Sequence, residues 1–477
     1  MFSHRASTDL GDGPTKKDAA PASVPTASRK PRRNFLAAWL SRLGLASLCY
    51  LLGAAVIFFE LPTSDFLRRA FVGGVAWYKE NQPLSPPPVQ GLSTIETKID
   101  KPEKRYDGYT LCMNGGGGPR AVLINMSSQP VHQWYTPLKT VLKGLEPSLT
   151  VAAREWEIYY NDGHIFPNGD LLALVEGPGN VRRMATNYGL VKVDKDSNLL
   201  WKYSGGCHHS FDVGEDGTIY ALSYDFVKEL PAGLESIPTP CLVDGVEVIS
   251  GDGKLVKRIS LLESIKNSPY AALLSTLEKP WLFRDVATPD EPSGAAHDEM
   301  HRRDTLHTNS IQVLTRALAP KFPLFKAGQL LISSRHLDAL AVLDPDSGKI
   351  VWATHGPWHA QHDASFLDNG HLLLFDNLGS TRGSRVLEYD PHTQALPWSY
   401  PDDNGLGKPF FSRTRGRTQR LPNGNTLIVS SDTGEMFEVT SDREVVWFVS
   451  FAEALNCARR YGPSQLPFLG GDPRARP

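Results

Sequence analysis

The sequence lacks an excess of charge of either sign. Its 50 basic and 52 acidic residues leave a formal net charge of −2 over 477 residues, so it carries no electrostatic footprint of a nucleic-acid-binding protein. Cysteine is scarce too, with five residues and no C-x-x-C pair, which removes the usual sequence evidence for a zinc or thioredoxin-like site. The length allows one large domain or two medium ones.

Long apolar runs are absent except for one. Residues 43–59, LGLASLCYLLGAAVIFF, carry no charge and are just long enough to span a bilayer. Basic residues precede them, and under the positive-inside rule they would keep that side in the cytoplasm: Arg29, Lys30, Arg32, Arg33 and Arg42. No small-x-small cleavage site follows closely. The pattern predicts an uncleaved transmembrane signal anchor over 35–61, with a buried core helix as the alternative.

The anchor would divide the chain into two sides. Residues 1–34 are rich in Ser, Pro, Ala, Lys and Arg and predict a disordered cytoplasmic tail. Residues 62–106 predict a juxtamembrane segment and an extended, proline-rich linker. The remainder is expected in the periplasm or at the cell exterior, attached to the cell inner membrane by a single pass.

The cysteines outside the apolar run are even in number, as is common in an oxidising compartment. Cys112 and Cys457 lie near opposite ends of the globular part and could join them in a disulfide. Cys207 and Cys241 could pair more locally. Free buried thiols are an equally acceptable reading.

Two hairpin patterns recur beyond the linker. The first is an alternating apolar run, a polar turn and a second run, and its copies end at Trp134, Trp201, Lys257, Trp352, Trp398 and Trp447. The second has a glycine in its turn, where positive φ is easily reached: Gly169, Gly217, Gly370 and Gly424. One hairpin of each type makes the four strands of a propeller blade. The recurrence predicts an all-β, six-bladed β-propeller over 107–460, with an insertion at about 261–303 that either shapes a site or is passive.

Three histidines occupy equivalent places in consecutive blades. The first strand of each blade lines the channel, so the starts of these strands converge on one mouth. Counting eight residues back from Gly217 gives His209, and from Gly370 it gives His362. His307 begins the blade between them. Three histidines in register around one axis indicate a functional site rather than ordinary strand residues.

The same count from Gly424 reaches Gly416, next to Arg417 and Thr418, so the sixth blade could add a cation. His208 neighbours His209, but on a regular strand it points to the opposite face, which favours a structural role.

Three imidazoles could also form a zinc centre. Because they come from separate blades with no close spacing, we favour nucleophilic and acid–base work on an anionic ester, with no metal and no cofactor.

Three runs carry a resemblance to a known family: DTLHTNSIQVL, GQLLISSR and QHDASFLDNGHLLLFDN. They resemble the bacterial arylsulfate sulfotransferases, which are six-bladed propellers that need no PAPS. The resemblance covers most of residues 107–450. It implies transfer of a sulfuryl group from an aryl sulfate to a phenolic acceptor, by ping-pong chemistry through a sulfohistidine.

The resemblance also implies residue roles. His362, in QHDA, matches the nucleophile, and Asp363 is only a possible orienting partner. His307 and His209 match the two assisting histidines, and Arg335 matches the arginine, whose planar donors suit an oxyanion. Three further residues are expected to bind substrate: Asn309, Arg417 and Thr418.

Two other classes of protein stay open. ALAVLDPDSGKIVW looks like the tryptophan-docking repeat of quinoprotein dehydrogenases, but no acidic cluster for a calcium-bound quinone accompanies it. A non-catalytic periplasmic propeller that binds glycans or proteins is the other alternative. Histidines at equivalent channel positions argue against it, because a scaffold has no need of them.

Overall fold

The structure is a computed structural model. It describes residues 95–114, 118–143, 158–177, 187–235, 237, 239–278, 304–381, 383–402, 407–452 and 454–470, together with the helical residues 44, 47, 48 and 50. The chain forms two units, Met1–Phe71 and Val72–Pro477. Within the described residues, no helix has the length and apolar character needed to cross a membrane. The predicted tail lies outside the described residues, as do most of the predicted anchor and linker.

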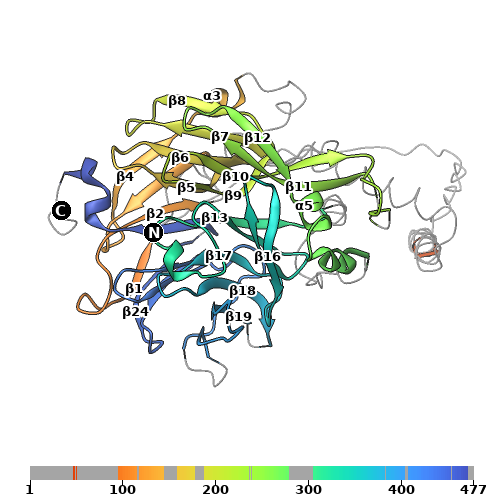
Figure 1. Cartoon of the computed structure of the whole chain (residues 1–477). Coiled ribbons are helices and arrows are strands. Elements are labelled where there is room, and N and C mark those ends of the chain that lie inside the picture. The colour runs from red at the N-terminus through yellow and green to blue at the C-terminus, as the bar shows by residue number, and fades with distance from the viewer. Residues whose placement is uncertain are drawn as a thin grey trace, which may run out of the picture. The chain divides into compact units, whose positions relative to one another are not determined.

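The second unit is built from six antiparallel sheets, which confirms the prediction of an all-β, six-bladed propeller (Figure 1). Four sheets use consecutive strands. The first two comprise β5 (Tyr159–Ile165), β6 (Leu171–Glu176), β7 (Asn187–Val193) and β8 (Leu199–Tyr203), then β9 (Cys207–Val213), β10 (Ile219–Val227), β11 (Cys241–Ile249) and β12 (Leu255–Ser260). The next two comprise β13 (Thr308–Val313), β14 (Leu330–Ser334), β15 (Ala339–Asp344) and β16 (Lys349–His355), then β17 (His362–Phe366), β18 (Leu372–Ser380), β19 (Gly383–Tyr389) and β20 (Trp398–Tyr400).

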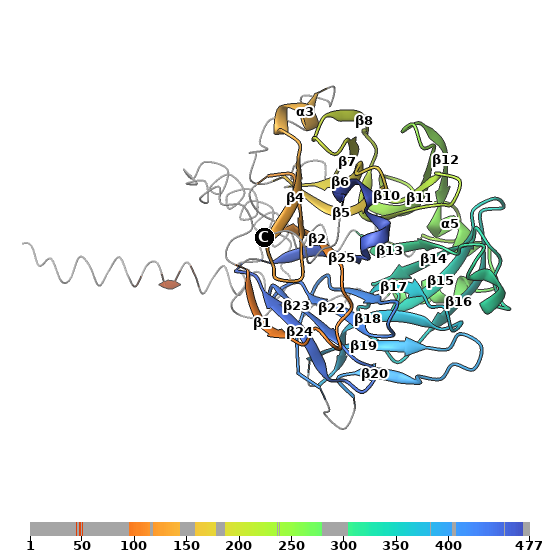
Figure 2. The same cartoon turned by 90° about the vertical axis from the view of Figure 1, so that its left-hand side faces the viewer.

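The last two sheets join the ends of the described chain, which the repeat pattern did not predict. One comprises β25 (Leu455–Tyr461), β2 (Tyr109–Asn114), β3 (Arg120–Ile124) and β4 (Pro130–Tyr135). The other comprises β21 (Arg417–Arg420), β22 (Thr426–Ser430), β23 (Glu435–Val439) and β24 (Val445–Ser450), with β1 (Glu96–Asp100) as a fifth strand. Figure 2 shows β25 beside β2 and β1 beside β24. The ring is therefore closed twice, by strands from opposite ends.

The second strand of each blade explains the longest apolar runs of the propeller. All residues of β6 and β14 are buried, because the two neighbouring blades cover both faces of each sheet. Tryptophans of the repeat join the blades. Trp134 Nε1 donates to the Gly169 carbonyl at 3.0 Å, and Trp447 Nε1 donates to the Met126 carbonyl at 3.1 Å. Both indoles are fully buried, so their pairing avoids an unsatisfied donor in the core.

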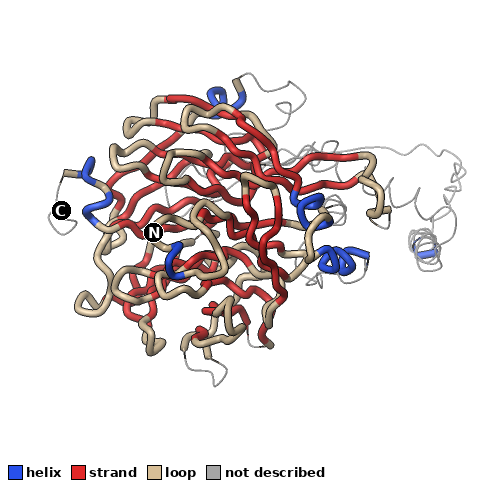
Figure 3. The backbone as a smooth tube through the Cα atoms, viewed as in Figure 1, coloured by secondary structure: helices blue, strands red, loops and turns tan. Residues whose placement is uncertain are grey.

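Helices are few and short in the described part, as Figure 3 shows. The predicted insertion begins as a helix, α5 (Leu261–Lys266), whose first turn is capped by the Ser260 side chain, and continues in a 3-10 helix, η2 (Ala271–Glu278). Residues 279–303 lie outside the described residues. The remaining short helices are α3 (Leu138–Leu142), η3 (Ala319–Lys321), η4 (Pro463–Gln465) and η5 (Pro467–Leu469).

The four cysteines of the propeller are buried and free: Cys112, Cys207, Cys241 and Cys457. Neither of the two disulfides that the sequence allowed is formed in the structure. Cys112 and Cys457 lie on the paired strands β2 and β25, where Cys112 faces Ala458 and Cys457 faces Met113. The ends of the propeller are therefore held by strand pairing and by side chains.

The side chain of Arg460 joins β25 to neighbouring elements where the ring closes, and we expect its loss to be strongly destabilising. Its buried guanidinium donates to Thr110 Oγ1 at 2.6 Å and to the Tyr106 carbonyl at 2.7 Å, and it contacts Glu438 Oε2 at 3.3 Å. Arg460→Ala leaves the Glu438 carboxylate buried without its cation. Breaking a buried pair in this way costs about 3–5 kcal/mol of unfolding free energy.

Urea unfolding followed by tryptophan fluorescence measures this cost. Arg316→Ala is the matched control, because Arg316 is 84% exposed and its contact with Glu215 is 3.8 Å long, so its loss should change stability by less than about 1 kcal/mol. Equal free energies of unfolding for the two variants would show that the Arg460 side chain does not stabilise the closure of the ring.

Candidate active site

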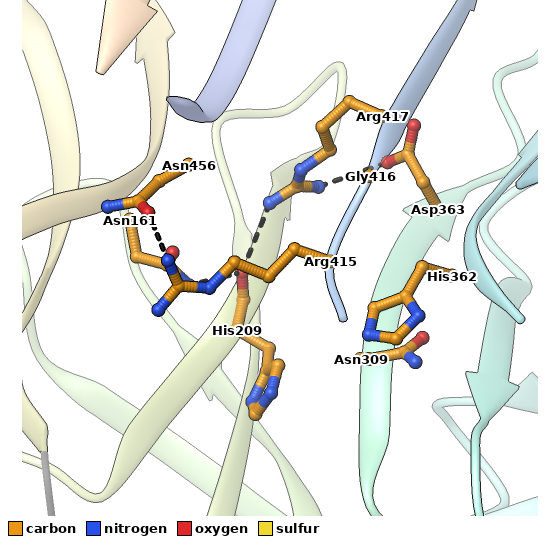
Figure 4. A pocket seen from close by; sticks show the side chains of 9 residues that line it. All are labelled: Asn161, His209, Asn309, His362, Asp363, Arg415, Gly416, Arg417 and Asn456. Atoms are coloured by element: carbon orange, nitrogen blue, oxygen red, sulfur yellow. Dashed lines mark hydrogen bonds and ion pairs between the residues drawn. The ribbon is translucent and has the colours of Figure 1, made fainter. Parts of the chain in front are cut away.

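The starts of the inner strands meet at one mouth of the channel. There they surround a pocket of about 20 Å³ (Figure 4) lined by Asn161, His209, Asn309, His362, Asp363, Arg415, Gly416, Arg417 and Asn456. His307 adjoins this pocket, since its ring centroid lies 4.9 Å from that of His209. The structure thus brings together the three histidines that the count from the turn glycines selected.

The backbone is unusual where these strands begin. Four residues with side chains adopt positive φ in consecutive blades: His209 (56°), His307 (47°), Asp363 (52°) and Arg415 (59°). Such conformations cost about 1–3 kcal/mol each and cluster at functional sites. The pairing of β9 with β10 and of β17 with β18 is also irregular near these residues. The positive φ values and the irregular pairing together direct side chains toward the channel axis, whereas a regular strand would direct them elsewhere.

His362 is held by its Nδ1 atom. Nδ1 lies 2.8 Å from Asn377 Oδ1 and 3.1 Å from the Ala360 carbonyl. The amide of Asn377 is itself fixed, because its Nδ2 donates to the carbonyls of Ser412 and Arg415. Two acceptors therefore face Nδ1, so Nδ1 carries the proton and the lone pair is on Nε2.

The charge state of His362 follows from its burial. Burial lowers the pKa of His362 well below its ordinary value, and the nearby charge of Arg335 lowers it further. The imidazole is therefore neutral at pH 7.

Asp363, the possible orienting partner, instead binds Arg417, at 3.0 Å, and the Thr418 amide, at 2.6 Å. The orienting residue in the structure is Asn377, which the sequence analysis did not select.

Arg335 directly follows β14 and is not among the residues that line the pocket, but its charge acts on two of the histidines. Its side chain is buried, its backbone amide donates to the His307 carbonyl at 3.0 Å, and its charge lowers the pKa of both His362 and His307. Burial is the larger cause in both cases. A permanent buried cation beside neutral imidazoles attracts an anion to this end of the channel.

His307 is oriented by Asp304, three residues earlier. Asp304 Oδ2 accepts from His307 Nδ1 at 2.7 Å, and the Asp304 carbonyl accepts from His336 Nδ1 at 2.9 Å. Ligand atoms of these three residues lie within 4.8 Å of one another. However, both Nδ1 atoms are already engaged and the two rings are tilted by only 40° at 4.8 Å, whereas the ligands of one ion point at a common centre. We interpret Asp304 as the residue that sets the tautomer of His307.

His208 does not point away from His209, as a regular strand would require. Their Nδ1 atoms lie 2.7 Å apart. The positive φ of His209 turns the chain between them, so the expectation of divergent side chains was wrong. Burial lowers the pKa of His208 to about 4 and that of His209 well below its ordinary value.

The sixth blade contributes two arginines. Arg417 lines the pocket, pairs with Asp363 and donates to the His209 carbonyl at 3.2 Å. Thr418 does not line this pocket. It lines a separate cavity of about 280 Å³ farther along the channel, and Asp363 and Arg417 line both spaces. Arg415, which was not selected from the sequence, also lines the pocket. It donates to Asn456 Oδ1, as Figure 4 shows, and to Tyr159 Oη at 3.2 Å.

Two amides of the pocket wall have unused polar atoms. Asn309 Nδ2 donates to the Gln361 carbonyl at 2.7 Å, which leaves its buried Oδ1 without a partner among the described residues. Asn456 Nδ2 is likewise buried and unpaired in the described part of the chain. Unpaired buried polar atoms are costly, and in a pocket wall they are available to a ligand.

The fold and the mouth together define a six-bladed propeller with an axial site of imidazoles and guanidinium groups. Residues 165–452 match the arylsulfotransferase (ASST) family, and the chain belongs to that family. Family membership makes sulfotransferase the enzyme class. The sequence matches no curated protein.

Solved structures are similar to the chain at low identity. They include a protein of unknown function from Bacteroides caccae (TM-score 0.45, 11% identity, 74% of this chain and 98% of that one). A streptogramin B lyase (0.37, 10%, 77% and 98%) and an inactive virginiamycin B lyase from Staphylococcus aureus (0.36, 9%, 74% and 88%) are also similar. Likenesses at this level carry no argument about function.

Proposed function

We propose that the protein transfers a sulfuryl group from an aryl sulfate to a phenol through His362, with no nucleotide donor. The observation that carries the proposal is the state of His362, which is neutral, has its proton fixed on Nδ1 by Asn377 and leaves Nε2 as a free lone pair. A neutral imidazole of this kind is a competent nucleophile at pH 7.

In the first half of the reaction, Nε2 attacks sulfur and the bond from sulfur to the aryl oxygen breaks. The bonding electrons leave with that oxygen, which takes a proton. The proton on Nδ1 stays in place because Asn377 Oδ1 can accept a hydrogen bond but no proton. The sulfurylated ring is therefore positively charged, which keeps the nitrogen–sulfur bond weak.

In the second half, a phenol oxygen attacks the same sulfur and loses its proton. The nitrogen–sulfur bond breaks, and its electrons return to Nε2. We assign to Arg335, together with Arg415 and Arg417, which line the pocket, the stabilisation of the charge on the equatorial sulfuryl oxygens in both steps. The pocket of about 20 Å³ has roughly the volume of one water molecule, so we assign sulfuryl oxygens to it and the aryl ring to the open side of the mouth.

His209 and His307 are assigned to proton transfer and oxygen binding, and Asn309 and Arg417 to substrate binding. Asn309 Oδ1 is suited to accept from the hydroxyl of the incoming phenol, because it has no other partner among the described residues. Arg417 contributes charge while its guanidinium pairs with Asp363. Thr418 acts indirectly, since its amide holds the Asp363 carboxylate at 2.6 Å.

The test uses the full chain in detergent, 4-nitrophenyl sulfate as donor and phenol as acceptor, with no nucleotide added. We expect release of 4-nitrophenolate that depends on phenol, with parallel lines in double-reciprocal plots at several phenol concentrations. The acceptor product should be phenyl sulfate, identified by mass spectrometry. Release of inorganic sulfate at the same rate with and without phenol would make the protein a sulfatase and refute the proposal.

We also propose that residues 35–61 anchor the protein in the cell inner membrane with the propeller on the outer side. Support comes from the uncharged run 43–59 and the basic residues before it. Protease added to intact spheroplasts should remove the propeller from the membrane fraction. Full protection would refute this orientation.

A further inference from the structure

Behind His209, on the side away from the pocket, lie two buried groups that bind no substrate. His208 and Asp244 are 2% and 1% exposed. His208 Nδ1 lies 2.7 Å from His209 Nδ1, and His208 Nε2 lies 3.6 Å from Asp244 Oδ1. A row of three groups therefore runs from the imidazole in the pocket wall to a carboxyl in the core, with a hydrogen-bond distance at its first step and 3.6 Å at its second.

The two inner members of this row, His208 and Asp244, each have one polar atom without a hydrogen bond in the described part of the chain. His208 Nε2 and Asp244 Oδ2 are buried and lack hydrogen-bond partners among the described residues. The other carboxyl oxygen is firmly held, because Asp244 Oδ1 accepts from the Thr308 amide at 3.0 Å and from the Thr308 hydroxyl. The closest approach of the two side chains is 3.6 Å, between His208 Nε2 and Asp244 Oδ1, so a proton can pass between them when thermal motion shortens this distance.

We propose that His208 and Asp244 form a buried relay that supplies one proton to the departing phenolate through His209 and takes it back from the acceptor. The inference rests on the proposed function. Both residues act through His209 and touch no substrate, so they are positioning residues for its proton. In a ping-pong reaction the first phenol leaves before the second one brings its proton, and a buried store supplies the first proton without help from solvent.

The proton balance is closed over one turnover. When the sulfur–oxygen bond breaks, His209 Nε2–H passes to the phenolate oxygen. The Nδ1 proton of His208 moves to His209 Nδ1, and the Asp244 proton moves to His208 Nε2, which leaves Asp244 ionised. When the acceptor phenol attacks, its proton enters at His209 Nε2 and each transfer is reversed.

The electrostatic surroundings agree with this direction of transfer. Burial, with the charge of Asp304, raises the pKa of Asp244 to about 8, whereas burial lowers the pKa of His208 to about 4. At pH 7 Asp244 is thus the member that holds the proton, and His208 is the member that passes it on. The other groups facing the row are Glu176, Ser223, Tyr224, Asp304, His307, His362 and Arg415.

The experiment compares two donors in the first half-reaction alone. Enzyme is mixed rapidly with 4-nitrophenyl sulfate or with phenyl sulfate, without acceptor, and the burst of released phenol is timed. Phenol, with a pKa near about 10 like the tyrosine side chain, needs a proton as it leaves, whereas 4-nitrophenol is far more acidic. In Asp244→Asn we expect the burst rate with phenyl sulfate to fall about 10²-fold, and that with 4-nitrophenyl sulfate to change by less than about 3-fold.

Asp244→Asn keeps an oxygen for the two Thr308 donors, so the fold should persist. His208→Phe is the second variant, because it keeps the ring that packs on Tyr224, 4.6 Å away, and it should show the same selectivity between donors. Asp252→Asn, in an exposed turn of the same blade, is the control and should change neither rate. Equal losses with both donors, or no loss in either variant, would overturn the relay. No burst from the unmodified protein would instead refute the proposed function.

Discussion

His362→Ala is expected to abolish 4-nitrophenolate release from 4-nitrophenyl sulfate, with a fall in kcat of at least about 10³-fold. The loss is large because the variant removes the only atom assigned to bond with sulfur, and removal of a nucleophile generally costs more than removal of an assisting group. Intact-mass analysis after addition of donor alone should show one added SO₃ group on the unmodified protein and none on the variant.

His392→Ala is the matched control, because His392 is exposed in the turn between β19 and β20 and its side chain has no part in the site. It should retain full activity. Imidazole in solution should partly restore His362→Ala, since the variant leaves a cavity of the shape of the lost ring. Substantial turnover in His362→Ala without added imidazole would assign the nucleophile to another residue.

Arg335→Gln is expected to lower kcat/KM by about 10²- to 10³-fold, as the loss of one preorganised donor to a developing oxyanion does in other enzymes. It should also move the acid limb of the pH–rate profile to higher pH. Burial first, and then the Arg335 charge, hold the pKa of His362 well below its ordinary value. Without that charge the pKa rises toward 6.5, and the neutral nucleophile is lost at a higher pH as the solution is acidified.

The pH–rate profile of kcat/KM distinguishes this effect from simple loss of structure. Arg335→Lys keeps the charge but not the planar set of donors, so it should lose rate while its acid limb stays near that of the unmodified protein. If Arg335→Gln and Arg335→Lys have the same acid limb, then the Arg335 charge does not set the pKa of His362.

The blades were predictable because each hairpin is local and repeats. Strands that pair with their neighbours in sequence leave a periodic record of apolar runs and turn glycines, and the same spacing from strand to turn places His209 and His362 eight residues before Gly217 and Gly370. Closure was not predictable in this way. The pairing of β25 with β2 joins residues far apart in the sequence, and no local pattern records such a contact.

The side-chain contacts of the site could not be predicted from residue types and spacing, because they depend on local changes in backbone direction. The positive φ of His209 brings His208 beside it, and a strand rule predicts the reverse. Asn377 lies within the run FDN that the resemblance included, yet only the fold places its amide oxygen at His362 Nδ1. Asp304 stood three residues before His307 in DTLH, and that spacing alone could not show that the two side chains bond.

The closure of the ring by the pairing of β25 with β2 has a consequence for biosynthesis. Asn456 is on β25, the last strand of the described residues, and it accepts a hydrogen bond from Arg415 in the pocket wall. A chain emerging from the ribosome therefore carries every histidine of the site before it can complete the wall around them. Ring closure and completion of the site are one event, so a nascent or prematurely ended propeller has its imidazoles but not the finished pocket.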